Sequence, residues 1–254
     1  MRVRKLTDTR LWPFTVGESV LRPFVFPWFN RRWIDGEKVP HTGGCVIVVN
    51  HISHLDPLTI AHFVYDHGRV PRYLAKSGLF KNKALGGFLR AAGQIPVERL
   101  SRNAVGAYDA AVAAVNLGQA VIVYPEGTLT RDPDLWPMRG KSGAARIALA
   151  TGCPVIPIGQ WGVHEVLPPY AKKPDLFPRK TIAMKAGDPV DLSDLLGQKP
   201  TAEVVQQATD RIMAAITELV ADLRGESAPT TRFDPRQAGV GEIGNPNGKK
   251  KRTS

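Results

Sequence analysis

A short apolar run followed by a polar turn constrains the fold of this chain more than any other feature. The run at residues 45–49 is apolar at every position, consists mostly of valine and isoleucine, and follows two glycines. Such a run is typical of a strand that is buried on both faces of a sheet. A polar stretch at residues 50–56 comes next, and residues 58–65 then have the pattern of a helix. A buried strand that leads into a helix favours an α/β architecture.

Further apolar runs and helical patterns extend this arrangement. Strands are also predicted at residues 120–124, 154–160 and 181–186, and helices at residues 58–65, 103–117, 141–150 and 201–223. Short buried strands that alternate with helices predict an α/β fold with a mostly parallel central sheet flanked by helices. Functional side chains of such sheets gather at the carboxyl ends of the strands. Both His51 and Glu126 follow a predicted strand there.

The charge balance indicates an anionic partner. The chain of 254 residues holds 34 lysines and arginines against 23 acidic residues, a formal net charge of +11. This balance suits nucleic acid, an anionic membrane surface or a phosphorylated substrate. No apolar run approaches the roughly 18 residues of a membrane-spanning helix, and prolines and charges interrupt the candidate for a signal peptide. Cys45 and Cys153 both lie in apolar runs, as buried free thiols of a reducing compartment would. We therefore expect a cytoplasmic protein.

Both ends of the chain differ in composition from its middle. Residues 1–33 carry seven basic and two acidic residues with three of the five tryptophans. This mixture suits contact with an anionic membrane, although the aromatic side chains could instead pack into the core. From residue 225 onward small and polar residues dominate, and the run at 249–252 is basic, which predicts a disordered, solvated basic tail. We expect a membrane-contacting segment at 1–33, a folded domain at 34–224 and the tail at 225–254.

The polar stretch has the residues of a general-base site. Ser53 and Asp56 have the spacing of a capping box, which places them at a helix start. Asp56 can accept a hydrogen bond from one ring nitrogen of His51, and this bond leaves the other nitrogen free as a base. Two alternatives stay open: Asn50, Ser53 and Asp56 only cap a helix, or His51, His54 and Asp56 bind a metal. The metal alternative is disfavoured because no Cys/His cluster elsewhere completes a site.

Four motifs, in this order along the chain, resemble those of the glycerolipid acyltransferases typified by 1-acylglycerol-3-phosphate (lysophosphatidate) acyltransferase. The first, N-H-x-S-x-x-D, matches residues 50–56 at every specified position. The second, a glycine, an apolar core and a basic residue, corresponds to residues 93–99. The third, F-P-E-G-T-R, corresponds to residues 124–128, after which Leu129 stands where the arginine belongs. The fourth, an apolar strand with proline, corresponds to residues 154–158. The resemblance covers roughly residues 35 to 195.

This resemblance implies a reaction and a set of site residues. A fatty acyl group would move from acyl-CoA or acyl carrier protein to the free hydroxyl of 1-acylglycerol-3-phosphate, giving phosphatidic acid for phospholipid synthesis without a cofactor. His51 would be the general base and Asp56 would orient it. No G-x-S-x-G motif is present, which favours direct transfer over an acyl-enzyme. The expected substrate-binding residues are Asn50, Ser53, Arg99, Glu126, Gly127, Thr128, Arg131 and Lys141.

The expected contacts differ in kind. Arg99 would present its planar guanidinium to the acceptor phosphate. The turn at residues 126–128 would bring backbone N–H groups close to the acceptor, because Gly127 permits a close approach. Arg131, or Arg139 or Lys141 in its place, would supply the positive charge that is missing at Leu129.

Because Leu129 replaces the motif arginine, the identity of the acceptor substrate stays undecided, and another lysophospholipid or a glycolipid is the alternative. Outside acyl transfer, the chain could be a basic membrane-binding scaffold, which the intact His51 and Asp56 disfavour. A nucleic-acid binder is disfavoured because the charge gathers at the two ends and no binding motif occurs. We expect lysophospholipid and acyl thioester substrates and an anionic membrane surface as partners. The protein would then be peripheral, at the cytoplasmic face of the cell membrane.

Overall fold

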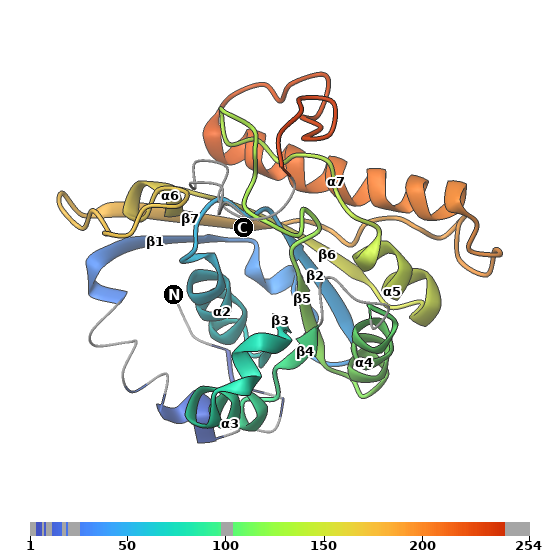
Figure 1. Cartoon of the computed structure of the whole chain (residues 1–254), viewed down its shortest axis with the longest axis horizontal. Helices are drawn as coiled ribbons and strands as arrows, with labels where there is room; N and C mark the ends of the chain where they lie inside the picture. Colours follow the sequence, from blue (N-terminus) through green and yellow to red (C-terminus); the bar gives the residue numbers. More distant parts are fainter. Residues whose placement is uncertain are drawn as a thin grey trace, which may run out of the picture.

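A seven-stranded sheet runs through the centre of the molecule (Figure 1). The structure is a computed structural model that describes residues 4–6, 8, 12–16, 19, 26–97 and 104–241. The strands are β1 (Phe29–Ile34), β2 (Cys45–Val49), β3 (Pro71–Lys76), β4 (Ile95–Val97), β5 (Ala120–Val123), β6 (Val155–Trp161) and β7 (Lys180–Ala186). The helices are α2 (Asp56–Asp66), α3 (Lys83–Ala91), α4 (Ala104–Asn116), α5 (Gly143–Thr151), α6 (Val163–Val166) and α7 (Ala202–Arg224). Short 3-10 turns are η1 (Phe26–Trp28), η2 (Gly36–Lys38) and η3 (Ser77–Lys81).

The strand order confirms the prediction of a mostly parallel sheet flanked by helices. Across the sheet the order is β1-β7-β6-β2-β5-β3-β4, and every neighbouring pair is parallel except β6 with β7. β2 occupies the middle, where Val46 lies beside Val121 of β5 and Val155 of β6. Each of the four predicted strands is found, with ends that differ by about one residue, which is the usual uncertainty of such ends.

Helices cover both faces of the sheet (Figure 1). On one face α4, α5 and α7 pack with Val46 and Val48, whereas on the other α2 and α6 pack with Ile47 and Val49. Alternate residues of β2 therefore enter different cores, because successive side chains of a strand point to opposite faces. This explains why the run at residues 45–49 is apolar at every position.

The predicted helices are confirmed, and two of their ends show the expected caps. The Thr201 hydroxyl accepts from the backbone N–H of Val204 at the start of α7, and Gly152 ends α5 with a φ of 66°. The sequence pattern did not predict α3, α6 or the strands β1, β3 and β4. No helix in the described part of the chain is both long and apolar enough to cross a bilayer.

The expected boundary after residue 33 falls inside a strand of the sheet. β1 pairs with β7 from Phe29 to Ile34, and Phe29 is buried. The Trp33 indole N–H donates to Asp66 of α2 over 3.2 Å, and its ring packs edge-on against Phe63. Residues 29–33 therefore belong to the folded domain, and the alternative of core packing holds for Phe29 and Trp33.

The segment at residues 226–241 also packs against the domain, contrary to the disorder expected from residue 225 onward. The backbone N–H of Arg139 donates to the carbonyl of Phe233 over 2.9 Å, and the Arg139 guanidinium pairs with Asp234 at 3.0 Å. Arg232 pairs with Asp210 of α7. Ion pairs and backbone hydrogen bonds hold this segment, which is why its low apolar content was misleading. The basic run at 249–252 lies outside the described residues.

Candidate active site

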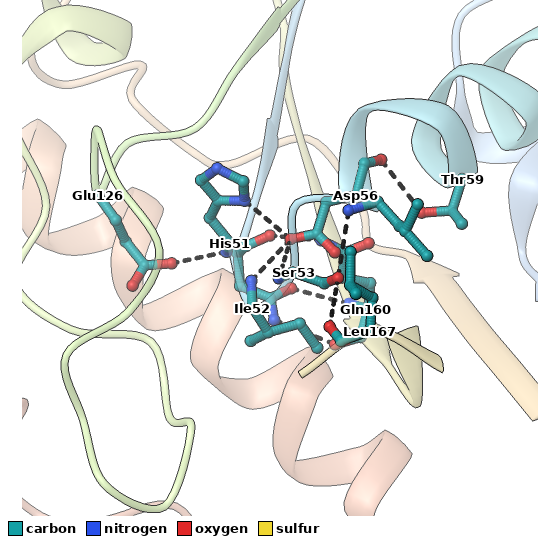
Figure 2. Close-up of polar contacts among 10 residues, drawn as sticks. His51, Ile52, Ser53, Asp56, Thr59, Glu126, Gln160 and Leu167 are labelled. Carbon is teal, nitrogen blue, oxygen red and sulfur yellow. Dashed lines mark hydrogen bonds and ion pairs between the residues drawn. The ribbon is translucent and has the colours of Figure 1, made fainter. Parts of the chain in front are cut away.

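A histidine and an aspartate meet at the carboxyl end of β2 (Figure 2). His51 Nδ1 donates to Asp56 Oδ2 over 2.8 Å. The backbone N–H groups of Ile52 and Ser53 donate to the same oxygen over 2.7 and 2.9 Å. Figure 2 shows the second ring nitrogen of His51 pointing away from the carboxyl group, and the side chain is 16% exposed. A substrate can therefore reach that nitrogen.

Burial and hydrogen bonding shift the pKa of the Asp56 carboxyl in opposite directions. The side chain is fully buried, and loss of solvent raises its pKa, whereas the bonds from His51, Ser53 and Ile52 favour the charged form and offset part of this effect. Oδ2 accepts from three N–H groups, so His51 carries its proton on Nδ1. The lone pair on Nε2 is then available to take a proton.

The ring of Tyr124 fixes the plane of the His51 imidazole. The two ring centroids lie 4.2 Å apart, and the planes meet at 27°. Tyr124 follows β5, which is the neighbour of β2, so adjacent strands supply the histidine and the ring that stacks on it. The backbone of His51 is held as well, because its carbonyl accepts from the N–H of Thr130 over 2.7 Å.

Glu126 holds the backbone that carries His51. Its carboxyl is 1% exposed; Oε1 accepts from the N–H of His51 over 2.8 Å and Oε2 from the N–H of Met138 over 3.1 Å. Burial raises the pKa of Glu126 to about 8, although both N–H groups favour the charged form. The residue was predicted as a substrate contact, whereas its observed contacts join the loops after β2 and β5.

The part of the chain that holds this geometry matches a known family. The family model described as Acyltransferase covers residues 31–161, just over half of the chain. The chain belongs to the acyltransferase family. His51, Asp56, Tyr124 and Glu126 all lie within the matched residues.

Individual relatives of this acyltransferase-family chain share one printed name. The 1-acyl-sn-glycerol-3-phosphate acyltransferase of Bacillus subtilis is 27% identical over 183 residues, which cover 72% of this chain and 84% of that protein. A chloroplast protein of that name from Brassica napus is 31% identical over 146 residues, or 57% of this chain. The chain spans only 41% and 39% of the length of the chloroplast relatives from Brassica napus and Arabidopsis thaliana.

A solved structure supports the fold of this family member. The crystal structure of the 1-acyl-sn-glycerophosphate acyltransferase PlsC from Thermotoga maritima matches with a TM-score of 0.63. The match covers 85% of this chain and 81% of that chain at 23% identity. The mostly parallel sheet with helices on both faces is therefore the fold of that acyltransferase.

Asn50 and Ser53 position the turn of this acyltransferase-family site and are not exposed to a substrate. Both side chains are fully buried. Asn50 exchanges hydrogen bonds with the backbone of Gln160 in β6, over 3.0 and 2.9 Å. Only half of the predicted capping box forms. Asp56 accepts from the Ser53 N–H, whereas the Ser53 hydroxyl donates to the carbonyl of Leu167 over 2.7 Å. The observed partners of both side chains are backbone groups of β6 and of Leu167, and their predicted substrate contacts stay a prediction.

Gly127 and Lys141 form an open part of the site. Gly127 has a φ of 72°, and a Cβ built on it would lie 3.1 to 3.2 Å from the outer carbons and Nζ of Lys141. The exposed Lys141 side chain therefore lies over the turn, and its backbone N–H donates to Pro125 over 2.7 Å. Thr128 is partly exposed beside them. The structure thus brings together Lys141 and the predicted turn at residues 126–128.

Arg131 is held in the wall of the site by Tyr170. Its guanidinium donates to the Tyr170 hydroxyl and lies 5.2 Å from the centroid of that ring. The Tyr170 ring also meets His54 edge-on, with centroids 5.7 Å apart. Leu129, at the position of the motif arginine, is only 2% exposed. An apolar side chain in the core thus replaces the motif cation, and Arg131 contacts Tyr170.

The second motif is described only up to Val97. Gly93 has a φ of 64°, and a Cβ there would lie 1.4 Å from Nη1 of buried Arg72, so this position requires glycine. Arg99 lies outside the described residues. β4 is parallel to β3, and β3 to β5, so the chain leaves β4 at the same edge of the sheet that carries His51.

A cavity of about 230 Å³ borders Glu126 and Lys141. Arg139 and Gln206 line it from the domain, and residues 234–236 line it from the C-terminal segment. The place of the C-terminal segment beside this cavity was not predicted, because nothing in its composition indicates where it packs. Positive and negative side chains from two parts of the chain therefore line a space next to the predicted turn, and Arg139 is paired with Asp234 there.

Proposed function

We propose that the chain transfers a fatty acyl group from an acyl thioester, on coenzyme A or acyl carrier protein, to the free hydroxyl of 1-acylglycerol-3-phosphate, giving phosphatidic acid. The carrying observation is the buried Asp56 that holds Nδ1 of His51 while Nε2 faces outward. The relatives named above act, by their printed names, on this acceptor. Their whole-protein activity is extended to this chain as a proposal.

In the proposed reaction Nε2 of His51 removes the proton of the acceptor hydroxyl as its oxygen attacks the thioester carbonyl. A C–O bond forms, the tetrahedral intermediate collapses, and the C–S bond breaks. The leaving thiolate takes the proton back from the imidazolium, which restores neutral His51. Asp56 stabilises the imidazolium and keeps the ring in place. Positioned acid–base catalysis of this kind contributes roughly 10²- to 10⁴-fold to a rate.

The raised pKa values of the two cysteine thiols favour direct transfer over a covalent acyl-enzyme. Burial raises the pKa of the Cys45 thiol to about 11 and also raises the pKa of Cys153. A thiol acts as a nucleophile only as its thiolate, and such pKa values disfavour the thiolate. Cys45 is buried in the core within β2, and Cys153, before β6, is partly buried against the core.

The acceptor phosphate would be bound by cations at the carboxyl edge of the sheet. Lys141 is the described candidate, because it is exposed over Gly127 and next to the cavity. Arg99 is a second candidate by its place after β4. Arg131 would contribute to acceptor binding by holding Tyr170 in place.

One observation favours a different acceptor within the same reaction class. Leu129 is buried where the motif has an arginine, so one cation expected near a phosphate is absent at that position. The second candidate function is therefore acylation of another lysophospholipid or of a glycolipid. In either case the acceptor resides in a membrane, and we propose that the protein binds peripherally at the cytoplasmic face.

A single assay tests the proposal. Purified protein receives labelled acyl-CoA, or acyl carrier protein loaded with the same chain, together with a panel of lysolipids that includes 1-acylglycerol-3-phosphate. We expect thiol release with a labelled phosphatidic acid product, and loss of both in His51→Ala. The matched control, His41→Ala, removes an exposed histidine that lies before the start of β2 and leaves His51 untouched. Product from a lysophospholipid or glycolipid alone selects the second candidate, and no product from folded protein overturns both.

A further inference from the structure

An exposed apolar surface covers η3 and α3. Leu79, Leu85 and Phe88 are 45%, 44% and 37% exposed, and they come from elements that lie next to each other. Single exposed apolar side chains are common on proteins, whereas contiguous groups mark interaction surfaces. We call Leu79, Leu85 and Phe88, together with Trp12, the η3–α3 surface.

The packing of α3 turns these side chains outward. Gly86 faces η3 so closely that a Cβ on it would lie 2.3 Å from the carbonyl oxygen of Phe80. Successive helical residues are rotated by ~100°, so Phe88 lies on the side of α3 away from Gly86, with Leu85 beside it. The contact at Gly86 thus fixes which face of the helix meets solvent.

The N-terminal segment joins this surface. Residues 12–16 form a helical turn beside α3 (Figure 1). The ring of Trp12 meets Phe88 edge-on, with centroids 6.0 Å apart, and Trp12 is still 61% exposed. An indole that keeps most of its surface in water while it contacts another exposed ring extends the apolar patch.

The segment that carries η3 and α3 has charge of one sign. No aspartate or glutamate occurs between residues 67 and 97, whereas six lysines and arginines do. Three of these cations, Lys81, Lys83 and Arg90, are exposed on η3 and α3. Apolar side chains flanked by cations suit the boundary between lipid headgroups and acyl chains. A neutral partner would leave the uniform charge unmatched.

The surface begins at the edge of the sheet that carries the catalytic histidine. η3 directly follows the carboxyl end of β3. The Tyr73 hydroxyl of β3 donates to the carbonyl of Pro57 over 2.6 Å, in the first turn of α2. The strand that leads into η3 is therefore tied to the start of α2, next to the turn that carries His51.

We propose that the η3–α3 surface docks on an anionic lipid bilayer, with Leu85, Phe88 and Trp12 inserted and Lys81, Lys83 and Arg90 at the headgroups. This inference deepens the proposed function by naming the surface that meets the membrane. It rests on no step of acyl transfer, so its test reads vesicle binding. The membrane contact predicted for residues 1–33 is thereby limited to the part that reaches α3.

Flotation with vesicles tests the proposal. Full-length protein is mixed with phosphatidylcholine vesicles that contain phosphatidylglycerol or lack it. Leu85→Ser combined with Phe88→Ser should weaken binding to the anionic vesicles by at least about tenfold, because two inserted apolar side chains are lost. Lys81→Glu combined with Lys83→Glu should weaken it at low salt by about fivefold or more per residue and reduce its salt dependence.

Matched variants make the result decisive. Leu117→Ser with Leu196→Ser removes two other exposed leucines and should leave binding unchanged. Trp28→Ser with Phe177→Ser removes the other exposed aromatic pair, whose centroids are 5.6 Å apart. If the Leu85/Phe88 variant is folded and floats like wild type, or if only the Trp28/Phe177 variant loses binding, the surface is wrongly placed. A change of oligomeric state without a change in flotation assigns the surface to a second copy instead.

Acyl transfer to a short-chain, monomeric lysophosphatidate separates this inference from the proposed function. The Leu85/Phe88 variant should retain wild-type turnover on that soluble acceptor and lose it on acceptor embedded in vesicles. Vesicle binding without any acyl transfer would overturn the proposed function and leave the docking surface standing. Equal loss on both acceptors would mean that the substitutions disturb the site itself.

Discussion

Replacing Glu126 with glutamine should change how the stability of the folded protein depends on pH. Burial raises the pKa of Glu126 from 4.5 to about 8 in the folded state. A carboxyl whose pKa is raised on folding contributes stability that is complete below about pH 4 and is lost as the pH rises through the folded-state pKa. With about 1.4 kcal/mol per pKa unit, a shift from about 4.5 to about 8 corresponds to a loss of about 5 kcal/mol by about pH 9. Glutamine, which is neutral throughout, loses none of it.

Urea unfolding of wild type and Glu126→Gln from about pH 5 to about pH 9 measures this difference. At low pH the wild type should be at least as stable, because glutamine has one oxygen where Glu126 accepts from both His51 and Met138. As the pH rises, the free energy of unfolding of the wild type should fall by a few kcal/mol relative to that of Glu126→Gln. Glu218→Gln, an exposed change on α7, is the control and should follow wild type. Parallel curves for all three proteins would refute the argument, because they would mean that the N–H groups keep Glu126 ionised.

Three further predictions concern catalysis, phosphate binding and the C-terminal segment. His51→Ala should lower kcat by at least ~10²-fold with little change in thermal unfolding. Asp56→Asn should also be severely impaired, since its amide cannot stabilise an imidazolium. More than about a tenth of wild-type activity in His51→Ala would exclude His51 as the general base. Lys141→Ala and Arg99→Ala should raise the KM for a phosphate-bearing acceptor more than the KM for acyl-CoA, and equal effects would indicate another role. Deletion from residue 226 should lower the Tm whereas deletion from residue 242 should not, because only the first removes the packed segment; equal Tm values would contradict its contribution.

The part of the site that could be predicted lies within one short stretch of chain. His51 and Asp56 are five residues apart, so the single turn between β2 and α2 brings them together, although distant residues such as Glu126 and Gln160 also hold that turn. The stacking of Tyr124 on His51 and the hydrogen bond from the His51 N–H to Glu126 join residues more than seventy positions apart. The motif located both residues on the sequence, but only the parallel pairing of β2 with β5 determines that they face His51.

The strands that sequence analysis missed lack the apolar pattern of a central strand. β1 lies at one edge of the sheet and exposes Asn30, Arg31 and Arg32, so it pairs with β7 on one side only. β4 lies at the opposite edge and is three residues long. A strand at an edge needs fewer buried side chains, because one side of it has no neighbouring strand and part of its surface meets solvent. Hydrophobic periodicity therefore detects the centre of this sheet and fails at its margins.

The order of residues 226–241 has a cause outside the segment itself. Composition measures whether a segment can bury enough apolar surface to compensate its own loss of entropy, and by that measure this one cannot. Here the domain supplies the fixed partners: the Arg139 N–H for Phe233, the Arg139 guanidinium for Asp234 and Asp210 for Arg232. Arg139 precedes Lys141 on the loop that Glu126 holds through Met138, so the packed segment and His51 are both held by this loop. Loss of the segment should therefore change substrate affinity as well as stability, which a solvated tail would leave unaffected.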